Sequence, residues 1–267
     1  MAESLPTLAA LSVGNTNLSL GLIDRGKVSS VRGMPVGAVE ELVSAIVEAG
    51  VDAVALASVN NDAVTKITDA LHKRSDATVY RIGRDIPIPM AHALTDEAIA
   101  KTGQDRLLAA FGAFQVVEQA CVVVDAGTAI TVDFVDGEGT FHGGAIAPGA
   151  SMQLRALSEG TVALPMIAPE KPVGRAIGTD TFGAMQRGMY YGIRGMVRLL
   201  TEQYAEEYEA YPLLIATGGD ARMLFEDDEL IDRIVPDLVL AGIAKCCDLA
   251  LGGGDGVLRL NNGRTGD

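Results

Sequence analysis

The chain has 267 residues and a formal net charge of -14, with 21 lysines and arginines against 35 aspartates and glutamates. Hydrophobic residues make up 48% of the chain and aromatic residues 4%, and tryptophan is absent. This length allows one large domain or two of ordinary size. Because the chain is acidic, its basic residues are dispersed and aromatic side chains are few, we expect it to bind neither nucleic acid nor an anionic membrane surface.

The cysteines and the N-terminus favour a cytoplasmic location. Cys121, Cys246 and Cys247 are odd in number and lack the spacing of a disulfide pair or a metal site. We therefore expect buried thiols in a reducing compartment. Residues 1–7 lack the basic start of a signal peptide, and no apolar run approaches the length of a membrane span.

Apolar runs and helical apolar spacing follow one another along the chain, which predicts an α/β fold with a mixed sheet. The predicted strands cover residues 8–13, 17–23, 51–59, 78–82 and 213–217. The predicted helices cover 36–49, 62–73, 95–118 (interrupted near Gly103), 151–159, 180–208 and 238–251. A glycine-rich segment spans 137–149, and the polar tail after Gly252 is expected to fray.

A glycine turn between two apolar strands occurs twice. The first copy reads LSVGNTNLSLG from Leu11 to Gly21, and the second reads VVDAGTAITVD from Val123 to Asp133. Each copy predicts a β-hairpin, and two of them about 113 residues apart suggest a duplicated domain with halves 1–118 and 119–267. Glycine amides beside a threonine hydroxyl can hold phosphate oxygens. An ordinary structural hairpin is the alternative for either copy alone.

An Asp–Arg pair stands behind a glycine at the start of a predicted helix, in the segment Gly103-Gln104-Asp105-Arg106. The arginine and the helix N-terminus suit an anionic substrate, and the aspartate can accept a proton from a hydroxyl. A helix cap with a surface ion pair is the simpler explanation for this segment taken alone.

The predicted helix over 180–208 carries glycines at positions 183, 188, 192 and 195. Small residues at this spacing allow another helix to approach closely. The partner is either a second subunit or another part of the same subunit, and the spacing does not decide between them.

A third glycine turn, Thr217-Gly218-Gly219, ends the predicted strand 213–217. Two phosphate-facing hairpins and a later Thr-Gly-Gly turn resemble the acetate and sugar kinase, Hsp70 and actin superfamily. That resemblance implies duplicated ribonuclease H-like halves with mixed sheets flanked by helices, an active-site cleft between them, and an adenosine close to the late glycine pair. The chain contains no Gly-Lys-Ser/Thr phosphate loop, which argues against a Walker-type ATPase.

The order of several further motifs extends the resemblance. After DAGTA at 125–129 come GGAIAPG at 143–149, IGTDT at 177–181, AMQRGMYYG at 184–192 and ATGG at 216–219. With GQDR at 103–106, these motifs resemble the type III pantothenate kinases from about residue 11 to residue 250. The resemblance implies ATP-dependent phosphorylation of pantothenate to 4'-phosphopantothenate, the first step of coenzyme A biosynthesis, by a homodimer.

The same resemblance implies a role for each matching residue. Asp105 is the expected general base for the pantothenate hydroxyl, and Arg106 is expected near the pantothenate carboxylate. The implied substrate-binding residues are Gly103, Gln104, Asp105, Arg106 and Thr181. Asp125 is the expected ligand of a monovalent cation, K⁺ or NH₄⁺, and Mg²⁺ accompanies ATP. The implied nucleotide-binding residues are Ser12, Val13, Gly14, Asn15, Thr16, Asn17, Leu18, Ser19, Thr128, Gly218 and Gly219.

Two positions depart from the family pattern. Ser12 stands where the family has the aspartate of Asp-x-Gly-Asn-Thr, and Asp24, the nearest later carboxylate, lies beyond the second predicted strand and is a poor substitute by position. Asp96 stands near the position of a tyrosine that lines the family's substrate pocket, with His92 as the closest ring. These departures leave two alternatives open: a non-catalytic member that binds a ligand or partner, and a kinase of the same fold with another small hydroxylated substrate.

Overall fold

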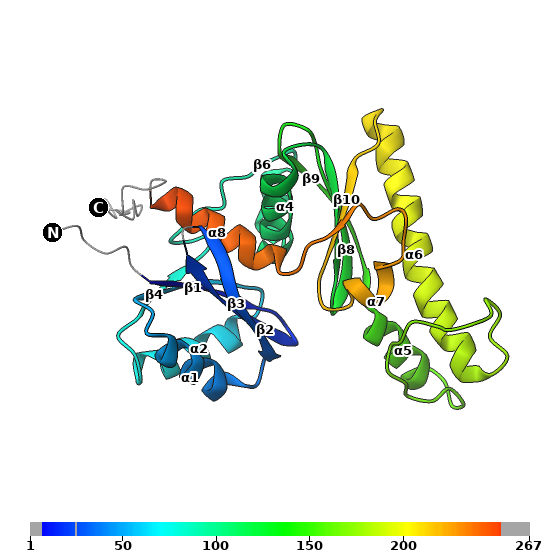
Figure 1. Cartoon of the computed structure of the whole chain (residues 1–267), viewed down its shortest axis with the longest axis horizontal. Helices are drawn as coiled ribbons and strands as arrows, with labels where there is room; N and C mark the ends of the chain where they lie inside the picture. The colour runs from blue at the N-terminus through cyan, green and yellow to red at the C-terminus, as the bar shows by residue number, and fades with distance from the viewer. Residues whose placement is uncertain (1–6, 25, 252–267) are drawn as a thin grey trace. The chain divides into compact units, whose positions relative to one another are not determined.

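The computed structural model describes residues 7–24 and 26–251, and all structural statements concern these residues. The chain divides into two compact units (Figure 1). The first unit contains residues 7–24 and 26–90, Ala100–Gly112 and residues 238–251. The second unit contains Ala91–Ile99 and Ala113–Asp237. Each unit is therefore built from segments that are distant in the sequence.

The first unit is built on a five-stranded mixed sheet of strand order β3-β2-β1-β4-β5. Its strands are β1 (Leu8–Val13), β2 (Asn17–Asp24), β3 (Lys27–Pro35), β4 (Ala53–Ser58) and β5 (Thr78–Arg81). Strands β1, β2 and β3 pair antiparallel, whereas β4 pairs parallel with both β1 and β5. The helices of this unit are α1 (Val39–Ala49), α2 (Asn61–His72), the first turns of α4 (Gln104–Val117), and α8 (Leu238–Ala250).

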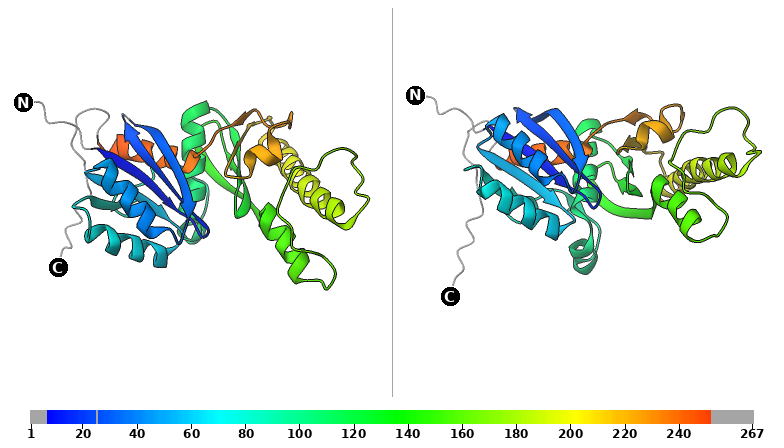
Figure 2. Two further views of the ribbon diagram at one scale, coloured as in Figure 1. Left: turned by 60° about the horizontal axis from the view of Figure 1, so that its bottom comes forward. Right: turned by 90° about the horizontal axis from the view of Figure 1, so that it is seen from below.

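Alternation along β1 determines what lies on each face of this sheet. Ala9 and Leu11 join the apolar cluster that includes α1 and α2, while Leu8 and Ala10 join the cluster that includes residues of α4 and α8. Figure 2 shows α1 and α2 together on one side of the sheet. By the same alternation, Ser12 belongs to the face that α4 and α8 cover.

The second unit is built on a six-stranded mixed sheet of strand order β11-β10-β7-β8-β9-β6. Its strands are β6 (Ala91–His92), β7 (Cys121–Ala126), β8 (Ala129–Val135), β9 (Thr140–Pro148), β10 (Leu213–Thr217) and β11 (Arg233–Ile234). Residues of α5 (Ala150–Glu159), α6 (Thr181–Tyr208) and α7 (Ala221–Phe225) form one apolar cluster with this sheet. The short helix α3 (Asp96–Lys101) precedes α4.

The two sheets repeat one topology, which confirms the predicted duplication. The order β9-β8-β7-β10-β11 matches β3-β2-β1-β4-β5, with the same pairs parallel and antiparallel. In this match Ser12 of β1 lies opposite Ala57 of its parallel neighbour, and Asp125 of β7 lies opposite Thr217. Ser12 and Asp125 therefore occupy equivalent positions in the two units.

The structure also differs from the sequence prediction. The glycine-rich segment contains strand β9, and β3, β6, β11 and α7 were not predicted. The final helix α8 packs on β1, β3 and β4 of the first unit, whereas the sequence-based division placed it in the half 119–267. The predicted boundary between residues 118 and 119 separates strands β1–β5 from the matching strands β7–β11. As a boundary between domains it stays a prediction. The tail after Gly252 lies outside the described residues.

The expectations for the cysteines and for membrane-spanning segments can be compared with the described residues. Cys121, Cys246 and Cys247 are buried free thiols, as predicted, and burial raises the pKa of each to about 12. Within 7–24 and 26–251, none of the helices combines the length and the apolarity needed to cross a bilayer.

Candidate active site

The first glycine turn lies at the end of β1, in the first unit. The Gly14 amide donates to the carbonyl of Asn17 at 2.9 Å, which closes the turn into β2. The side chains of Asn15, Thr16 and Asn17 are exposed, while Ser12 is half-buried. A short tight turn at the carboxyl end of a strand presents its backbone amides to a ligand.

The Asp–Arg segment begins α4 in the same unit. Gly103 precedes the helix, and a methyl group there would lie 2.4 Å from Oδ1 of Asp105 and 3.7 Å from Cγ1 of Val59. The Val59 amide donates to the carbonyl of Val13 at 3.3 Å. Val59 thus contacts both the end of β1 and the start of α4, so the first turn and Asp105 lie at the same end of the first sheet.

Gln104 has a close neighbour in the loop after β5. A methyl group on Gly83 would lie 2.3 Å from Nε2 of Gln104, and Gly83 has a φ of +81°. The left-handed backbone conformation favours glycine at this position, and a side chain there would displace the amide end of Gln104. This contact fixes the first residue of α4, next to Asp105.

The second glycine turn and the late glycine pair meet in the second unit. Asp125 is half-buried near the end of β7, and Gly218 follows the neighbouring strand β10. A methyl group on Gly218 would lie 2.4 Å from Oδ1 of Asp125 and 2.4 Å from the carbonyl oxygen of Ala126, and Gly218 has a φ of +93°. The Asp220 amide donates to that carbonyl at 2.9 Å. Burial raises the pKa of the Asp220 carboxyl.

The backbone of Gly149 packs against the second glycine turn, at residues 127 and 128. The sequence analysis did not assign this role to Gly149. Its amide donates to the carbonyl of Thr128 at 3.1 Å, and a methyl group on it would lie 2.1 Å from the carbonyl oxygen of Gly127. Gly149 is also the N-cap of α5, so this helix begins beside the turn. A helix N-terminus carries partial positive charge and suits an anion. In the sequence, the Pro148-Gly149 pair directly before a predicted helix could have indicated this helix N-terminus.

Thr181 is the first residue of α6, in the second unit. The carboxylate of its neighbour Asp180 accepts a hydrogen bond from the Gly183 amide at 2.6 Å and caps the helix. Asp180 and Phe182 line a cavity of about 430 Å³, which is bounded by residues 170–187. Thr181 itself is exposed.

The candidate residues therefore fall into two groups, each described within its own unit. The first unit contains residues 12–19 and 103–106, which share one end of its sheet. The second contains Asp125, Thr128, Gly218 and Gly219, which lie at the ends of adjacent strands, and Thr181 at the start of α6.

The two departures from the family pattern have clear locations. Asp24 lies at the opposite end of β2 from Ser19, the residue paired with Ser12, and so cannot replace a carboxylate at Ser12. Asp96 is exposed in the first turn of α3, and His92 is exposed in β6.

Oxygen donors suited to a cation lie beside Gly218. The Asp125 carboxylate and the Ala126 carbonyl both approach it closely, and carboxylate and carbonyl oxygens are ligands that hard cations prefer. Among the described residues, no three His, Cys, Asp or Glu side chains are grouped as a metal site would need. A divalent ion there would depend on phosphate oxygens for most of its ligands, as Mg²⁺ commonly does.

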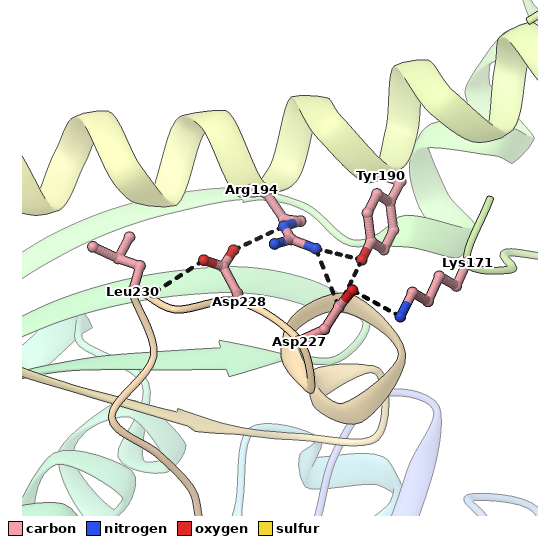
Figure 3. Close-up of polar contacts among 6 residues, drawn as sticks. All are labelled: Lys171, Tyr190, Arg194, Asp227, Asp228 and Leu230. Atoms are coloured by element: carbon pink, nitrogen blue, oxygen red, sulfur yellow. Dashed lines mark hydrogen bonds and ion pairs between the residues drawn. The ribbon is translucent and has the colours of Figure 1, made fainter. Parts of the chain in front are cut away.

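A polar network connects α6 to the loop after α7 (Figure 3). Arg194 pairs with Asp228 at 2.8 Å and with Asp227 at 3.4 Å, and it also donates to the Tyr190 hydroxyl. Lys171 pairs with Asp227 at 2.9 Å, and its hydrogen bond holds the pKa of the Asp227 carboxyl below the ordinary value. These contacts attach residues near 171 and near 227 to one helix.

Comparison with solved structures defines the class of fold. A conserved protein of the Baf family from Campylobacter jejuni superposes with a TM-score of 0.59 at 19% identity, covering 90% of this chain and 98% of that one. The ethanolamine utilization protein EutJ from Carboxydothermus hydrogenoformans gives a TM-score of 0.55 at 15% identity, covering 91% and 90%. With the duplicated sheets, these similarities show the fold that the sequence predicted, duplicated ribonuclease H-like halves of the actin-like ATPase type.

Sequence comparison identifies the family. The family model described as type III pantothenate kinase matches residues 8–203. The type III pantothenate kinase of Caulobacter vibrioides is 33% identical over 196 residues, which cover 73% of this chain and 74% of the relative. That of Syntrophotalea carbinolica is 28% identical over 249 residues, covering 88% and 96%. The chain belongs to the type III pantothenate kinase family.

Some matches are shorter. The type III pantothenate kinase of Akkermansia muciniphila is 42% identical over 149 residues, which span 61% of that relative and 56% of this chain. The match to the Endomicrobium trichonymphae protein spans 54% of the relative's length.

Proposed function

We propose that the protein transfers the γ-phosphoryl group of ATP to the hydroxyl group of pantothenate and releases 4'-phosphopantothenate and ADP, the first step of coenzyme A biosynthesis. The observation that carries this proposal is the Gly103–Arg106 segment at the start of α4, in a chain of this family. There, Gly103 leaves room for the carboxylate of Asp105 at the same sheet end as the first glycine turn.

Asp105 acts as the general base in this proposal. Its carboxylate accepts the hydroxyl proton while the pantothenate oxygen bonds to the γ-phosphorus and the bond from that phosphorus to ADP breaks. Oδ1 of Asp105 accepts the Arg106 amide at 2.9 Å, which restrains the side chain. Arg106 suits the pantothenate carboxylate, since guanidinium and carboxylate groups form charge-assisted hydrogen bonds. Gly103, Gln104 and Thr181 are the other residues that the family resemblance assigns to pantothenate binding.

The glycine turns hold the nucleotide in this proposal. Backbone amides of residues 12–19, the Thr128 hydroxyl and the N-terminus of α5 suit phosphate oxygens, and the Gly218-Gly219 turn leaves room for adenosine. Asp125 is the proposed ligand of K⁺ or NH₄⁺, and Mg²⁺ comes with ATP. When bound, these cations supply positive charge that offsets the charge of the phosphates.

We also infer a cytoplasmic homodimer with α6 at the subunit interface. Methyl groups on Gly188, Gly192 and Gly195 would meet no atom of another described element within 4 Å, so these glycines do not serve helix packing within residues 7–24 and 26–251. Tyr191 and Leu199 are exposed on the same helix, at 49% and 59%. Exposed apolar side chains beside small residues favour a second copy as the partner.

The test is ADP release by purified protein with ATP, Mg²⁺ and NH₄⁺, with and without pantothenate. We expect release that requires pantothenate and that Asp105→Asn abolishes while its thermal unfolding stays that of the wild type. Asp62→Asn, on the exposed first turn of α2, is the matched control and should keep wild-type turnover. A folded wild-type protein without release would overturn the proposal. A panel of sugars and hydroxy acids would then identify a different acceptor. No ADP release with any of them would indicate that the protein binds a ligand or partner without catalysis.

A further inference from the structure

The segment between α5 and α6 has little apolar packing after residue 172. It forms no helix or strand from residue 161 to residue 180. Val173 is 88% exposed and Ile177 is 71% exposed. Because burial of these side chains contributes little, polar contacts must fix the course of this stretch.

Arg187 supplies those contacts from the second turn of α6. Its Nη2 donates to the carbonyl of Val173 at 2.9 Å and its Nε to the carbonyl of Arg175 at 2.7 Å. Its Nη1 donates to the carbonyl of Gly183 at 3.1 Å, within its own helix. Two nitrogens of this half-buried side chain thus join residues 173–175 to α6, the third binds within the helix, and the same side chain lines the 430 Å³ cavity.

Other anchors hold the two ends of this stretch. Before residue 173, the Gln186 side chain donates to the carbonyl of Ala168 at 2.6 Å and accepts from the Glu170 amide at 3.0 Å. Lys171 pairs with Asp227 (Figure 3). On the other side Asp180 caps α6. Between these anchors, Arg187 supplies the hydrogen bonds that reach Val173 and Arg175 from the described part of the chain.

Gly178 follows in the same stretch and lies against α6. A methyl group on it would lie 2.6 Å from the Ala184 nitrogen, so the backbone passes closely over the first turn of the helix. Residues 173–178 are therefore held against the turn that Thr181 begins.

We propose that Arg187 is a positioning residue for pantothenate binding, because it holds residues 173–178 against the start of α6 and so keeps Thr181 and the adjoining cavity wall in place. This inference rests on the proposed function, in which Thr181 contributes to the pantothenate site. Arg187 acts through the backbone carbonyls of Val173 and Arg175, and nothing in the proposal requires it to touch the substrate.

The role requires arginine rather than positive charge alone. A guanidinium presents its N–H groups in a planar fork and can reach several carbonyls at fixed angles. A lysine ammonium is a point charge on a flexible stem and does not reproduce that geometry. We therefore expect Arg187→Lys to behave like Arg187→Met.

Limited trypsin digestion tests the holding function without any need for activity. Trypsin cleaves after arginine, and the carbonyl of the Arg175–Ala176 bond is the one that accepts from Nε of Arg187. In Arg187→Met and Arg187→Lys we expect initial cleavage at this bond to be about tenfold faster than in the wild type, the factor that one lost hydrogen bond from a charged donor gives. Arg222→Met, which removes an exposed arginine of α7, is the matched control.

Kinetics tests the positioning function. We expect the KM for pantothenate to rise about tenfold in both Arg187 variants, with kcat and the KM for ATP within about twofold of wild type. A merely structural role would lower the folded fraction and hence the apparent kcat without raising this KM selectively. Unchanged cleavage at Arg175, or an unchanged KM for pantothenate, overturns the inference. A wild-type protein without pantothenate-dependent turnover overturns the proposed function instead, and the cleavage rates still decide whether Arg187 holds the segment.

Discussion

Gly103 and Asp105 are in such close contact that a methyl group on Gly103 would lie 2.4 Å from Oδ1 of Asp105 and 3.5 Å from its Cγ. That oxygen also accepts the Arg106 amide at 2.9 Å. The absence of a side chain at Gly103 thus permits the observed rotamer of Asp105. Gly103 does not have a left-handed φ, so alanine suits its backbone and only the carboxylate has to move.

The first prediction follows from this contact. Gly103→Ala should lower kcat by about tenfold or more, a cost of about 1.4 kcal/mol in transition-state stabilisation, because the displaced carboxylate no longer meets the substrate hydroxyl. Thermal unfolding should change little. Steady-state kinetics of ADP release measures the first effect and calorimetry the second. Gly37→Ala is the control, since a methyl group there would meet no atom within 4 Å. A Gly103→Ala enzyme with wild-type kcat would remove Asp105 from the proposed role.

A second pair of glycines lets α4 and α8 cross closely. A methyl group on Gly242 would lie 2.3 Å from the carbonyl oxygen of Leu108, and one on Gly112 would lie 2.6 Å from that of Leu238. These obstacles are backbone atoms, which cannot rotate away as a side chain can. Gly242→Ala should therefore separate the helices and destabilise the protein by about 1–3 kcal/mol. Urea unfolding beside Gly37→Ala measures this difference, and equal midpoints would show that the crossing tolerates a methyl group.

The elements that the sequence predicted are those with strong local signals. The hairpins around Gly14 and Gly127 have apolar strands on both sides of a glycine turn, and both occur where expected. The break before α4 coincides with Gly103, where a glycine and a helix start are adjacent in the sequence. The equivalence of Ser12 and Asp125 follows from the same repeat, and strand pairing confirms it.

The elements that the sequence missed depend on distant neighbours. Strand β9 contains Gly143 and Gly144, residues with low strand propensity, yet a methyl group on Gly144 would lie 2.0 Å from the carbonyl of Val132 in β8. Close pairing of two backbones required glycine there and overrode propensity. The placement of α8 in the first unit and the contacts of Arg187 with backbone carbonyls likewise have no local pattern in the sequence.

Ser12 provides a direct test of the nucleotide site. It is half-buried on the sheet face that α4 and α8 cover, and its equivalent in the second unit is an aspartate, Asp125. Ser12→Asp should lower the KM for Mg-ATP by about fivefold or more, because a charged acceptor binds cations and metal-bound water more strongly than a hydroxyl does. Without Mg-ATP the variant should be less stable than wild type, since its carboxylate lacks a counterion.

The control for Ser12→Asp is Ser29→Asp on β3, where the serine is exposed. This variant should keep the wild-type KM and the wild-type response to Mg²⁺. Thermal shifts with and without Mg-ATP, measured beside the kinetics, separate nucleotide binding from general stability. An unchanged KM for ATP in Ser12→Asp would place Ser12 outside the site that binds the metal and phosphates.

Gly188, Gly192 and Gly195 of α6 lie on the face proposed as the subunit interface, so a substitution there tests the homodimer. Gly192→Leu places a large side chain where a methyl group would meet no atom of another described element within 4 Å. If the face is a subunit interface, the leucine should separate the subunits, and light scattering after gel filtration should change from dimer to monomer mass. Gly33→Leu on β3, where a methyl group also meets no atom within 4 Å, should remain a dimer. A Gly192→Leu protein of unchanged mass would exclude this face from the interface.

The turn between β8 and β9 should make stability depend on pH in acid. Oδ1 of Asp136 accepts the amides of Glu138 and Thr140 at 2.9 Å each, and its Oδ2 lies 2.7 Å from Nε2 of His142. Burial alone would raise the pKa of this carboxyl, but the hydrogen bonds from His142 and the two amides outweigh it and hold the pKa below the ordinary value of 3.8.

A carboxyl whose pKa is lower in the folded protein than in the unfolded chain stabilises the fold when ionised. Its contribution is complete above the unfolded pKa and is lost as the pH falls through the folded one. The free energy of unfolding of wild type should therefore exceed that of Asp136→Asn by a constant amount above about pH 5, and the difference should shrink as the pH falls below about 4. Urea unfolding across this range measures it, with Asp69→Asn on the exposed side of α2 as the control. A difference that persists undiminished at the lowest pH would mean that the turn does not depend on the charge of Asp136.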